Sequence, residues 1–326
     1  MYNEFYGFSE EPFEPGPDPK FLYLSPSHQD ALVALFNGME DRKGFISLTG
    51  ETGTGKKTLL HFLLGRLDHK VKPVFILHPP ATFEDLLREI FGELSLKVSG
   101  EDKQALLNQL NEYLENLLED EALVVIIDEG QTLPKEVMEE LAKLREMIPL
   151  TSNRLQVLFI GPPEFEDRLN SSDLSQINKK IGTRCQIKAL SEEESRGYID
   201  HRLKRVGSSG SEAFTPNAIS TILIHAKGIP RVINLLCSRA FQVGCGLSRK
   251  RIDAEIVGEV INEMQNPAPQ KSIPANIVPS LRESPWRLLR TNLSPRRISF
   301  AIVSLLCLGG FFLLINGFLQ PKTTRT

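Results

Sequence analysis

Continuous apolar runs alternate with helix-spaced apolar positions through the first two-thirds of the chain. Runs of strand length occupy residues 44–49, 73–78, 122–128 and 155–161. Apolar side chains recur at helical spacing in residues 56–67, 83–94 and 103–118. Continuous apolar strands suit a parallel sheet that is covered on both faces, and strands that alternate with helices indicate βαβ units. The pattern therefore predicts an α/β fold, a parallel sheet flanked by helices, over residues 1–189.

The pattern changes near residue 190, after which apolar positions recur at helical spacing. Ser191, followed by Glu192, Glu193 and Glu194, has the features of a helix N-cap with acids in the first turn. Helical spacing then continues in residues 215–226, 230–243 and 253–264. We expect a small helical domain over residues 190–265. Five prolines between residues 266 and 285 then predict an extended linker, which reaches residue 297 with a basic end.

Residues 298–319 form a long apolar stretch without a charged side chain. As a helix, these 22 residues would span roughly 33 Å, which matches the hydrocarbon core of a bilayer. A buried core helix is the alternative, but such helices usually keep a polar face. Arginines precede the stretch at positions 287, 290, 296 and 297, whereas Lys322 and Arg325 follow it. The bias predicts one membrane-spanning helix, with the N-terminal side in the cytoplasm and a short tail, residues 320–326.

Charge and cysteine content argue against several classes of protein. The net charge of −3 gives no reason to expect nonspecific attraction to nucleic acid. The four cysteines are widely spaced and include no C-x-x-C pair, so neither a disulfide framework nor a zinc site is predicted. The N-terminus lacks a basic segment followed by an apolar one, and we therefore expect no secretory signal peptide.

A glycine-rich loop lies between a predicted strand and a predicted helix and matches the pattern G-x-x-x-x-G-K. Its sequence is Gly50-Glu51-Thr52-Gly53-Thr54-Gly55-Lys56. In this context the glycines let backbone N–H groups face an anion, the helix N-terminus adds its dipole, and Lys56 reaches the β- and γ-phosphates. The alternative is a tight glycine turn with a surface lysine. We predict that this loop binds the phosphates of a nucleotide and that Lys56 takes part in catalysis.

Two carboxylates end the predicted strand that begins at residue 122. In P-loop enzymes the first acid at this place, here Asp128, holds Mg²⁺, and the second, here Glu129, polarises the attacking water. Two acids at a strand end are also common surface residues. Their position about 70 residues after the phosphate loop favours the functional interpretation.

Further motifs accompany the phosphate loop along the chain. They are Phe5-Tyr6-Gly7-Phe8, Pro12-Phe13, Pro17-Asp18-Pro19, Ser25-Pro26-Ser27-His28, Gly44-Phe45, Asp128-Glu129-Gly130-Gln131 and Gly228-Ile229-Pro230-Arg231-Val232-Ile233-Asn234. Together they resemble the ExeA/GspA group of AAA+ ATPases from bacterial secretion. The resemblance implies an AAA+ core with a helical lid, and ATP with Mg²⁺ at the joint between them. It also implies that Arg231 is the lid arginine that reaches the γ-phosphate, although from the sequence alone Arg231 is equally a surface charge after a proline turn.

The chain departs from the family pattern at Lys57, where the family has the Ser or Thr whose hydroxyl ligates Mg²⁺. An ammonium cannot ligate a cation, and Thr58 lies ~100° further round the helix, so we count Thr58 only with the nucleotide-binding residues. Two hypotheses stay open. In one, Lys57 replaces the charge of Mg²⁺, and the pocket binds nucleotide but hydrolyses it poorly. In the other, Lys57 turns to solvent, a water completes the metal shell, and a slow ATPase remains.

Two other departures concern catalysis. The family has a polar side chain at a sensor position after the fourth strand, where this chain has Gly161-Pro162-Pro163-Glu164. The chain also has Lys179-Lys180-Ile181 where the family tends to show Gln-Arg-Ile. The resemblance therefore predicts that Lys180 replaces an arginine finger acting on a neighbouring copy, without the planar fork of arginine.

In the resembled family the ATPase lies on the cytoplasmic face of the inner membrane and helps to insert an outer-membrane secretion channel, with a wall-binding domain after its helix. This chain ends at Thr326, so we expect that domain to be absent and a membrane protein partner to supply the outer contact. The resemblance implies a homo-oligomeric, ATP-binding protein, anchored in the lipid bilayer, that couples nucleotide binding to assembly of a secretion or export apparatus. The alternatives are a catalytically silent nucleotide-binding scaffold and a DNA-associated regulator of the transposition type. The acidity of the chain and the lack of a basic stripe in residues 1–265 disfavour nucleic acid as a partner.

Overall fold

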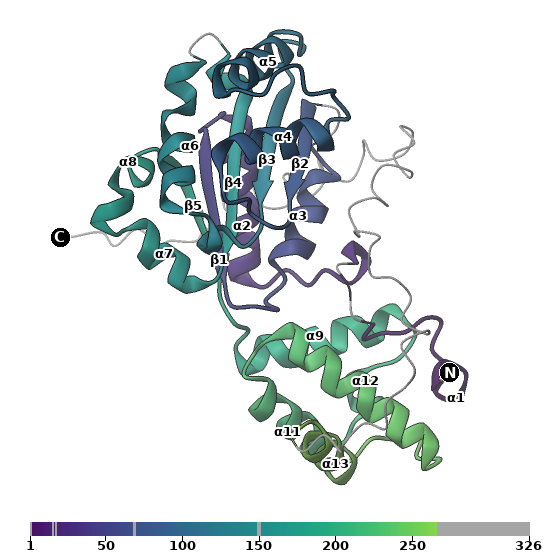
Figure 1. The fold of residues 1–326 in the computed structure, drawn as a ribbon. Coiled ribbons are helices and arrows are strands. Elements are labelled where there is room, and N and C mark those ends of the chain that lie inside the picture. Colours follow the sequence, from purple (N-terminus) through teal and green to yellow (C-terminus); the bar gives the residue numbers. More distant parts are fainter. Residues whose placement is uncertain (1, 15, 17, 68–69, 149–150, 266–326) are drawn as a thin grey trace, which may run out of the picture. The chain divides into compact units, whose positions relative to one another are not determined.

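The computed structural model describes residues 2–14, 16, 18–67, 70–148 and 151–265 (Figure 1). The predicted linker, spanning helix and tail, residues 266–326, lie outside the described residues. Across the described ranges, no helix combines the length and the apolar character that crossing a bilayer requires. Membrane anchoring by residues 298–319 therefore stays a prediction.

Five strands of the described chain form one parallel sheet in the order β2-β3-β4-β1-β5. The strands are β1 Phe45–Gly50, β2 Val71–Ile76, β3 Ala122–Ile127, β4 Leu155–Gly161 and β5 Ile181–Ile187. The four predicted strands are confirmed, and β2 begins two residues earlier than the pattern indicates. The apolar pattern did not predict β5, because this strand lies at the sheet edge and only Cys185 and Ile187 are buried in it.

Helices cover both faces of the sheet (Figure 1). They are α2 Pro26–Glu40, α3 Lys56–Leu64, α4 Phe83–Glu93, α5 Lys103–Glu115, α6 Lys135–Met147, α7 Pro163–Leu169 and α8 Ser175–Asn178. On β3, Val124 and Ile126 pack with the apolar side chains of α2 and α3. Val125 and Ile127 point the other way and pack with those of α4, α5 and α6. Because successive side chains of a strand alternate between faces, one continuous apolar run supplies both halves of the core.

A helical domain follows the sheet in the chain. It consists of α9 Glu192–Arg205, α10 Gly210–Ala213, α11 Pro216–Ala226, α12 Pro230–Gly246 and α13 Ala254–Gln265. Ser191 caps α9 as predicted, since its side chain accepts from the backbone N–H of Glu194 and the Glu194 carboxylate accepts from Ser191 in return. This capping box satisfies two backbone donors that the first turn leaves unpaired.

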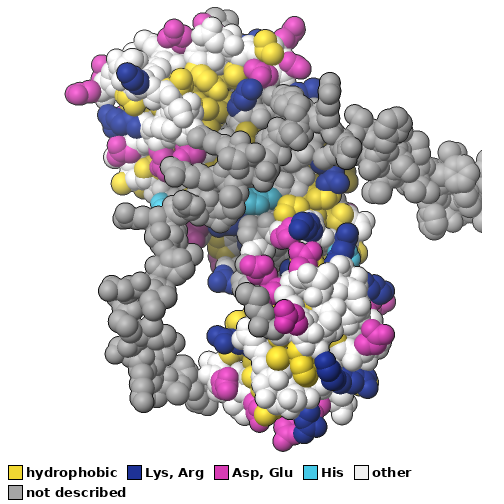
Figure 2. Space-filling view, turned by 90° about the vertical axis from the view of Figure 1, so that its right-hand side faces the viewer, with side chains coloured by type: hydrophobic (Ala, Val, Ile, Leu, Met, Phe, Trp, Pro, Cys, Tyr) yellow, Lys and Arg dark blue, Asp and Glu magenta, His cyan; other side chains and the backbone are white. Residues whose placement is uncertain are grey.

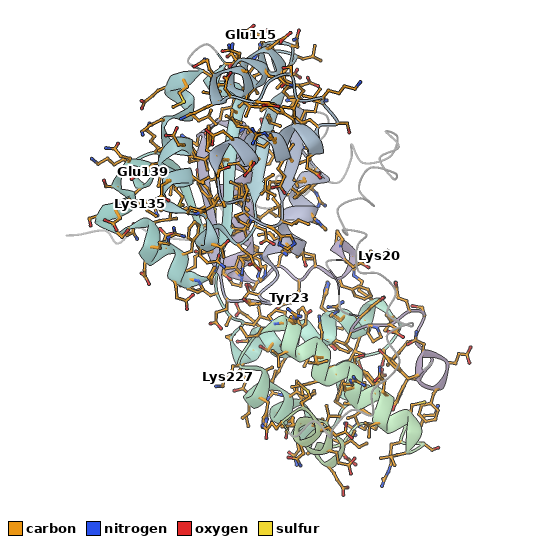
Figure 3. All side chains as sticks on the ribbon, in the orientation of Figure 1. Lys20, Tyr23, Glu115, Lys135, Glu139 and Lys227 are labelled. Carbon is orange, nitrogen blue, oxygen red and sulfur yellow. The ribbon has the colours of Figure 1, made fainter. Side chains whose placement is uncertain are left out.

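The N-terminal segment, here called the strap (residues 2–14, 16 and 18–23), contributes to the core of the helical domain. It contains α1 Tyr2–Tyr6 and a 3₁₀ turn, Pro19–Phe21. Tyr2, Phe8 and Phe13 are buried beside Phe241 of α12, and the rings of Tyr2 and Phe241 stack with centroids 5.7 Å apart. The sequence predicts that the strap belongs to the α/β domain of residues 1–189. Its buried side chains instead pack with the helical domain. The strap then continues to Tyr23, which Figure 3 shows beside the helical domain.

Candidate nucleotide-binding site

The glycine-rich loop joins β1 to α3, and its backbone requires glycine at two positions. Gly53 has φ +90° and Gly55 has φ +100°, values that side-chain-bearing residues rarely adopt. A Cβ atom on Gly53 would lie 2.7 Å from the Cβ of Arg231, and one on Gly55 would lie 3.1 Å from Nε2 of His28. Conformation and space therefore both require glycine. The loop ends at the N-terminus of α3, where free backbone N–H groups favour an anion.

Lys56 is the first residue of α3, and its side chain folds back over the loop. Its Nζ donates to the carbonyl oxygens of Gly50 at 2.5 Å and Glu51 at 2.9 Å. Burial lowers the pKa of Lys56, the neighbouring Lys57 lowers it further, and the carboxylates of Asp128 and Glu51 oppose this shift. An ammonium has three N–H donors, so one stays available for a phosphate oxygen.

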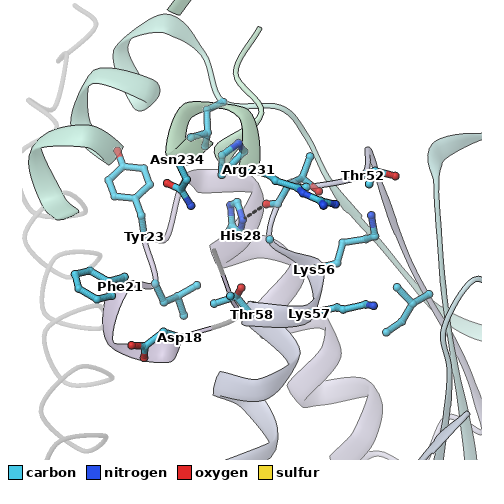
Figure 4. A pocket seen from close by; sticks show the side chains of 18 of the residues that line it. Asp18, Phe21, Tyr23, His28, Thr52, Lys56, Lys57, Thr58, Arg231 and Asn234 are labelled. Atoms are coloured by element: carbon cyan, nitrogen blue, oxygen red, sulfur yellow. Dashed lines mark hydrogen bonds between the residues drawn. The ribbon is translucent and has the colours of Figure 1, made fainter. Parts of the chain in front are cut away.

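His28 of α2 forms a hydrogen bond with the backbone of the loop. Its Nε2 lies 2.9 Å from the carbonyl oxygen of Thr54, which can only accept, so Nε2 carries the proton and donates (Figure 4). Nδ1 then accepts from the hydroxyl of Ser25 at 2.7 Å. His28 is 3% exposed, and burial lowers its pKa. The contact of His28 with the loop joins residues 26 positions apart in the sequence, so the motif that contains His28 does not predict it.

We expect protonation of His28 to destabilise the fold. Its pKa lies below the ordinary value of 6.5, so the unfolded chain binds this proton more readily than the folded chain does. The contribution to stability is therefore complete above about pH 6.5 and is lost as the pH falls toward the lowered pKa. The free energy of unfolding, measured in urea between about pH 7.5 and 5.5, should decrease less steeply in His28→Gln than in the wild type. Equal slopes in the two proteins would contradict this assignment.

Asp128 and Glu129 follow β3, as predicted, and both line the cavity beside the loop. Asp128 is buried, and its backbone N–H donates to the carbonyl oxygen of Ile76 on β2. The Nζ atom of Lys57 lies 2.5 Å from Oδ2 of Asp128. Glu129 is exposed and has φ +51°, which is uncommon for a residue with a side chain and is found disproportionately at functional sites. Lys57 thus contacts the carboxylate that is predicted from the sequence to hold Mg²⁺.

The end of β4 lines the cavity with apolar groups, namely Ile160, Gly161 and Pro162. The polar sensor side chain is therefore missing from this strand end, as the sequence indicated. Gln131 also lines the cavity, and its Oε1 is buried without a hydrogen-bond partner in the described structure. Gln131 therefore places a polar amide in the cavity lining, two residues after Glu129 in the sequence.

The first turn of α12, in the helical domain, lines part of the cavity. The backbone N–H of Arg231 donates to the carbonyl oxygen of Gly53 at 3.2 Å, which links the helical domain to the phosphate loop. Arg231 and Asn234 both line the cavity, and Tyr198 of α9 donates to Oδ1 of Asn234 at 2.8 Å. The structure thus places Arg231 beside the loop, while its contact with a γ-phosphate stays a prediction.

Lys180 lies outside the lining of this cavity. Its Nζ bonds to the carbonyl oxygen of Ala142 and to Oε1 of Glu146, each at 2.5 Å. The predicted role of Lys180 toward a neighbouring copy stays a prediction.

The cavity has a volume of about 470 Å³, within the range of small-molecule sites. The strap residues Phe21, Leu22 and Tyr23 line it together with the loop and α12. Of the predicted nucleotide-binding residues, the cavity is lined by Thr52, Gly53, Thr54, Gly55, Lys56, Lys57, Thr58 and Arg231. Gly50 and Glu51 instead present their carbonyl oxygens to Lys56. Figure 4 shows Tyr23, His28, Lys56 and Arg231 around one space, which the glycine loop, the basic side chains and the apolar strap make suitable for a nucleotide.

The residues fit Mg²⁺ poorly. The ion prefers oxygen ligands in a nearly octahedral arrangement, and here Asp128 contacts the ammonium of Lys57. The side chain of Thr58 leaves α3 on the opposite side from that of Lys57 (Figure 4), so its hydroxyl does not replace the missing ligand.

Comparison with known proteins agrees with this geometry. The family model described as "AAA domain" matches residues 39–169. The general secretion pathway protein A of Aeromonas hydrophila is 38% identical over 242 residues, which cover 74% of this chain and 44% of that protein. The chain therefore spans less than half the length of this relative.

Solved structures show the same fold at low sequence identity. Cdc6p from Pyrobaculum aerophilum is 18% identical with a TM-score of 0.62, covering 77% of this chain and 70% of that one. The ORC2 protein of Aeropyrum pernix, solved as ADPNP and ADP complexes, is 18% identical with a TM-score of 0.58, covering 81% and 74%. The chain thus belongs to the AAA+ P-loop proteins and is related, over about three quarters of its length, to general secretion pathway protein A.

Proposed function

We propose that this chain is an ATP-binding AAA+ protein, anchored in the bacterial inner membrane by residues 298–319, that couples nucleotide binding to the assembly of a secretion or export apparatus. The observation that carries the proposal is the convergence of the phosphate loop, Asp128, Glu129 and Arg231 on one cavity. The relation to general secretion pathway protein A supports the secretion role. The homo-oligomer and the membrane protein partner belong to the same proposal.

The residues that line the cavity connect nucleotide binding to the helical domain and to the strap. Backbone N–H groups of the loop and the third donor of Lys56 hold the phosphates, and Arg231 approaches them from α12. Since Arg231 also bonds through its backbone to Gly53, a bound nucleotide strengthens the connection between the loop and the helical domain. The strap packs with the lid and lines the same cavity, so nucleotide binding acts on both.

The face of the molecule seen in Figure 2 offers little support for the nucleic-acid alternative. On the face seen in Figure 2, acidic and basic side chains are interspersed over the sheet domain and the helical domain. A protein that tracks duplex DNA usually gathers Lys and Arg along one face. The net charge of −3 agrees with this distribution.

The proposal is tested in cells by placing a photo-crosslinking amino acid at successive positions of residues 298–319. We expect the full chain to sediment with membranes and the crosslinker to capture a membrane protein or a second copy. Lys56→Ala should change the captured neighbour or reduce its yield, because assembly depends on bound nucleotide. Lys135→Ala, which removes an exposed lysine of α6 (Figure 3), serves as the control. No captured neighbour, or an unchanged capture in Lys56→Ala, would refute the coupling.

A further inference from the structure

We infer that this chain takes up its nucleotide without a divalent metal, because the Lys57 ammonium holds the position on Asp128 that a magnesium ion would need. The inference rests on the proposed nucleotide binding and adds the form of the ligand, metal-free ATP or ADP. It also decides between the two hypotheses that the sequence leaves open for Lys57.

The position of Asp128 is fixed by the sheet. It directly follows β3, and its backbone N–H bonds to the carbonyl oxygen of Ile76 on the neighbouring strand at 2.9 Å. Its side chain is only 13% exposed, and the apolar residues of β3 precede it. A carboxylate in this position needs a cationic partner, because burial without one is costly.

Lys57 provides that partner from the adjacent helix. Its Nζ lies 2.5 Å from Oδ2 of Asp128, so the ammonium and the carboxylate are in direct contact and form a charge-assisted hydrogen bond. The Lys57 side chain is half-exposed, so it reaches Asp128 from the cavity side, where Lys57 and Asp128 both belong to the lining. The hypothesis that Lys57 turns to solvent therefore does not describe this structure.

A metal ion would have to displace this ammonium or bind beside it. Bound beside it, the ion would meet a positive charge at close range and would lack the hydroxyl ligand that Ser or Thr gives at this position. Displacing it would separate Asp128 from Lys57 and leave the lysine facing the cation. Glu129 is exposed and also lines the cavity, but one further carboxylate does not replace the set of oxygen ligands that Mg²⁺ needs.

The ion pair still performs part of the role of the metal. It neutralises Asp128, which would otherwise repel the phosphates, while Lys56 and Arg231 supply positive charge around them. An ammonium carries one charge and cannot coordinate two phosphate oxygens together, so it gives less stabilisation to the charge that develops during phosphoryl transfer. Binding should persist without metal, whereas turnover should be slow.

The test measures ATP binding to the full chain in a mild detergent by calorimetry, once with EDTA and once with excess Mg²⁺. The wild type should bind ATP in EDTA, and Mg²⁺ should not tighten binding by more than about threefold. Lys57→Thr restores the hydroxyl and frees Asp128, and we expect Mg²⁺ to tighten its binding of ATP about tenfold or more. Lys135→Thr, the same change at an exposed lysine of α6, should behave as the wild type.

The outcomes separate this inference from the proposed function. If the wild type binds ATP only with Mg²⁺, the inference is overturned and the proposed nucleotide binding stands. If the wild type binds ATP in neither buffer, the proposed function fails and the inference fails with it. Equal affinity in EDTA and Mg²⁺ for the wild type, with a new Mg²⁺ dependence in Lys57→Thr, would support both.

Discussion

Lys56→Ala should weaken ATP binding by roughly 10- to 100-fold, because it removes a charge-assisted hydrogen bond to phosphate worth about 1.5–3 kcal/mol. In the structure the Lys56 ammonium already lies at the mouth of the loop, bonded to the carbonyl oxygens of Gly50 and Glu51. The substitution therefore removes a phosphate ligand and also two bonds that close the loop. The dissociation constant measured by calorimetry checks the expectation.

The control for this substitution separates the two effects. Lys56→Gln keeps a neutral N–H donor on a similar side chain but removes the charge, so it should lose affinity for ATP while it destabilises the nucleotide-free chain less than Lys56→Ala does. Lys135→Ala removes an exposed lysine of α6 and should bind ATP as the wild type does. An affinity of Lys56→Ala within about threefold of the wild type would contradict the assignment of this lysine to the phosphates.

Arg202→Ala should lower the free energy of unfolding by roughly 3–5 kcal/mol, because it leaves a cavity and an unpaired buried carbonyl. Arg202 of α9 is 4% exposed. It donates to the carbonyl oxygen of Pro12 in the strap at 2.6 Å and to the Tyr198 hydroxyl at 2.7 Å. Its guanidinium also lies 4.6 Å from the ring centroid of Phe21. One side chain therefore joins the strap to the helical domain.

Guanidinium chloride unfolding of the full chain in detergent measures this effect. Arg196→Ala on the same helix is the matched control, because Arg196 is exposed and pairs with Glu192 one turn away. An exposed pair of this kind contributes about 0.3–0.5 kcal/mol. If Arg202→Ala were no more destabilising than Arg196→Ala, the strap would not depend on this contact.

The sequence predicted those features whose signals are local. The run before Gly50 and the run before Asp128 are continuous and apolar, so β1 and β3 were predicted, and with them the loop and the two acids that follow. The N-cap at Ser191 depends on residues at most three positions away and was also predicted. In each case neighbouring residues carry the full physical reason for the structure.

Features that depend on distant contacts were not predicted. The strap packs with Phe241, which is more than 200 residues away in the sequence. His28 bonds to Thr54 of the loop, and hydrophobic periodicity carries no information about such a contact. For Lys57 the sequence left two directions of the side chain open, because Lys57 lies on α3 and its partner Asp128 follows β3, far away in the sequence. These contacts follow from the tertiary arrangement of the whole chain, which no short segment determines.

Every proposal for this chain depends on backbone N–H groups between Gly50 and Lys56 that enclose a polyphosphate. A crystal structure of the full chain in detergent, grown with excess ATP and EDTA, tests this most directly. We expect the β-phosphate inside the loop, within hydrogen-bond distance of its backbone N–H groups and of Lys56, with Lys57 still on Asp128. A loop of unchanged conformation that contains no phosphate at saturating ATP would contradict it.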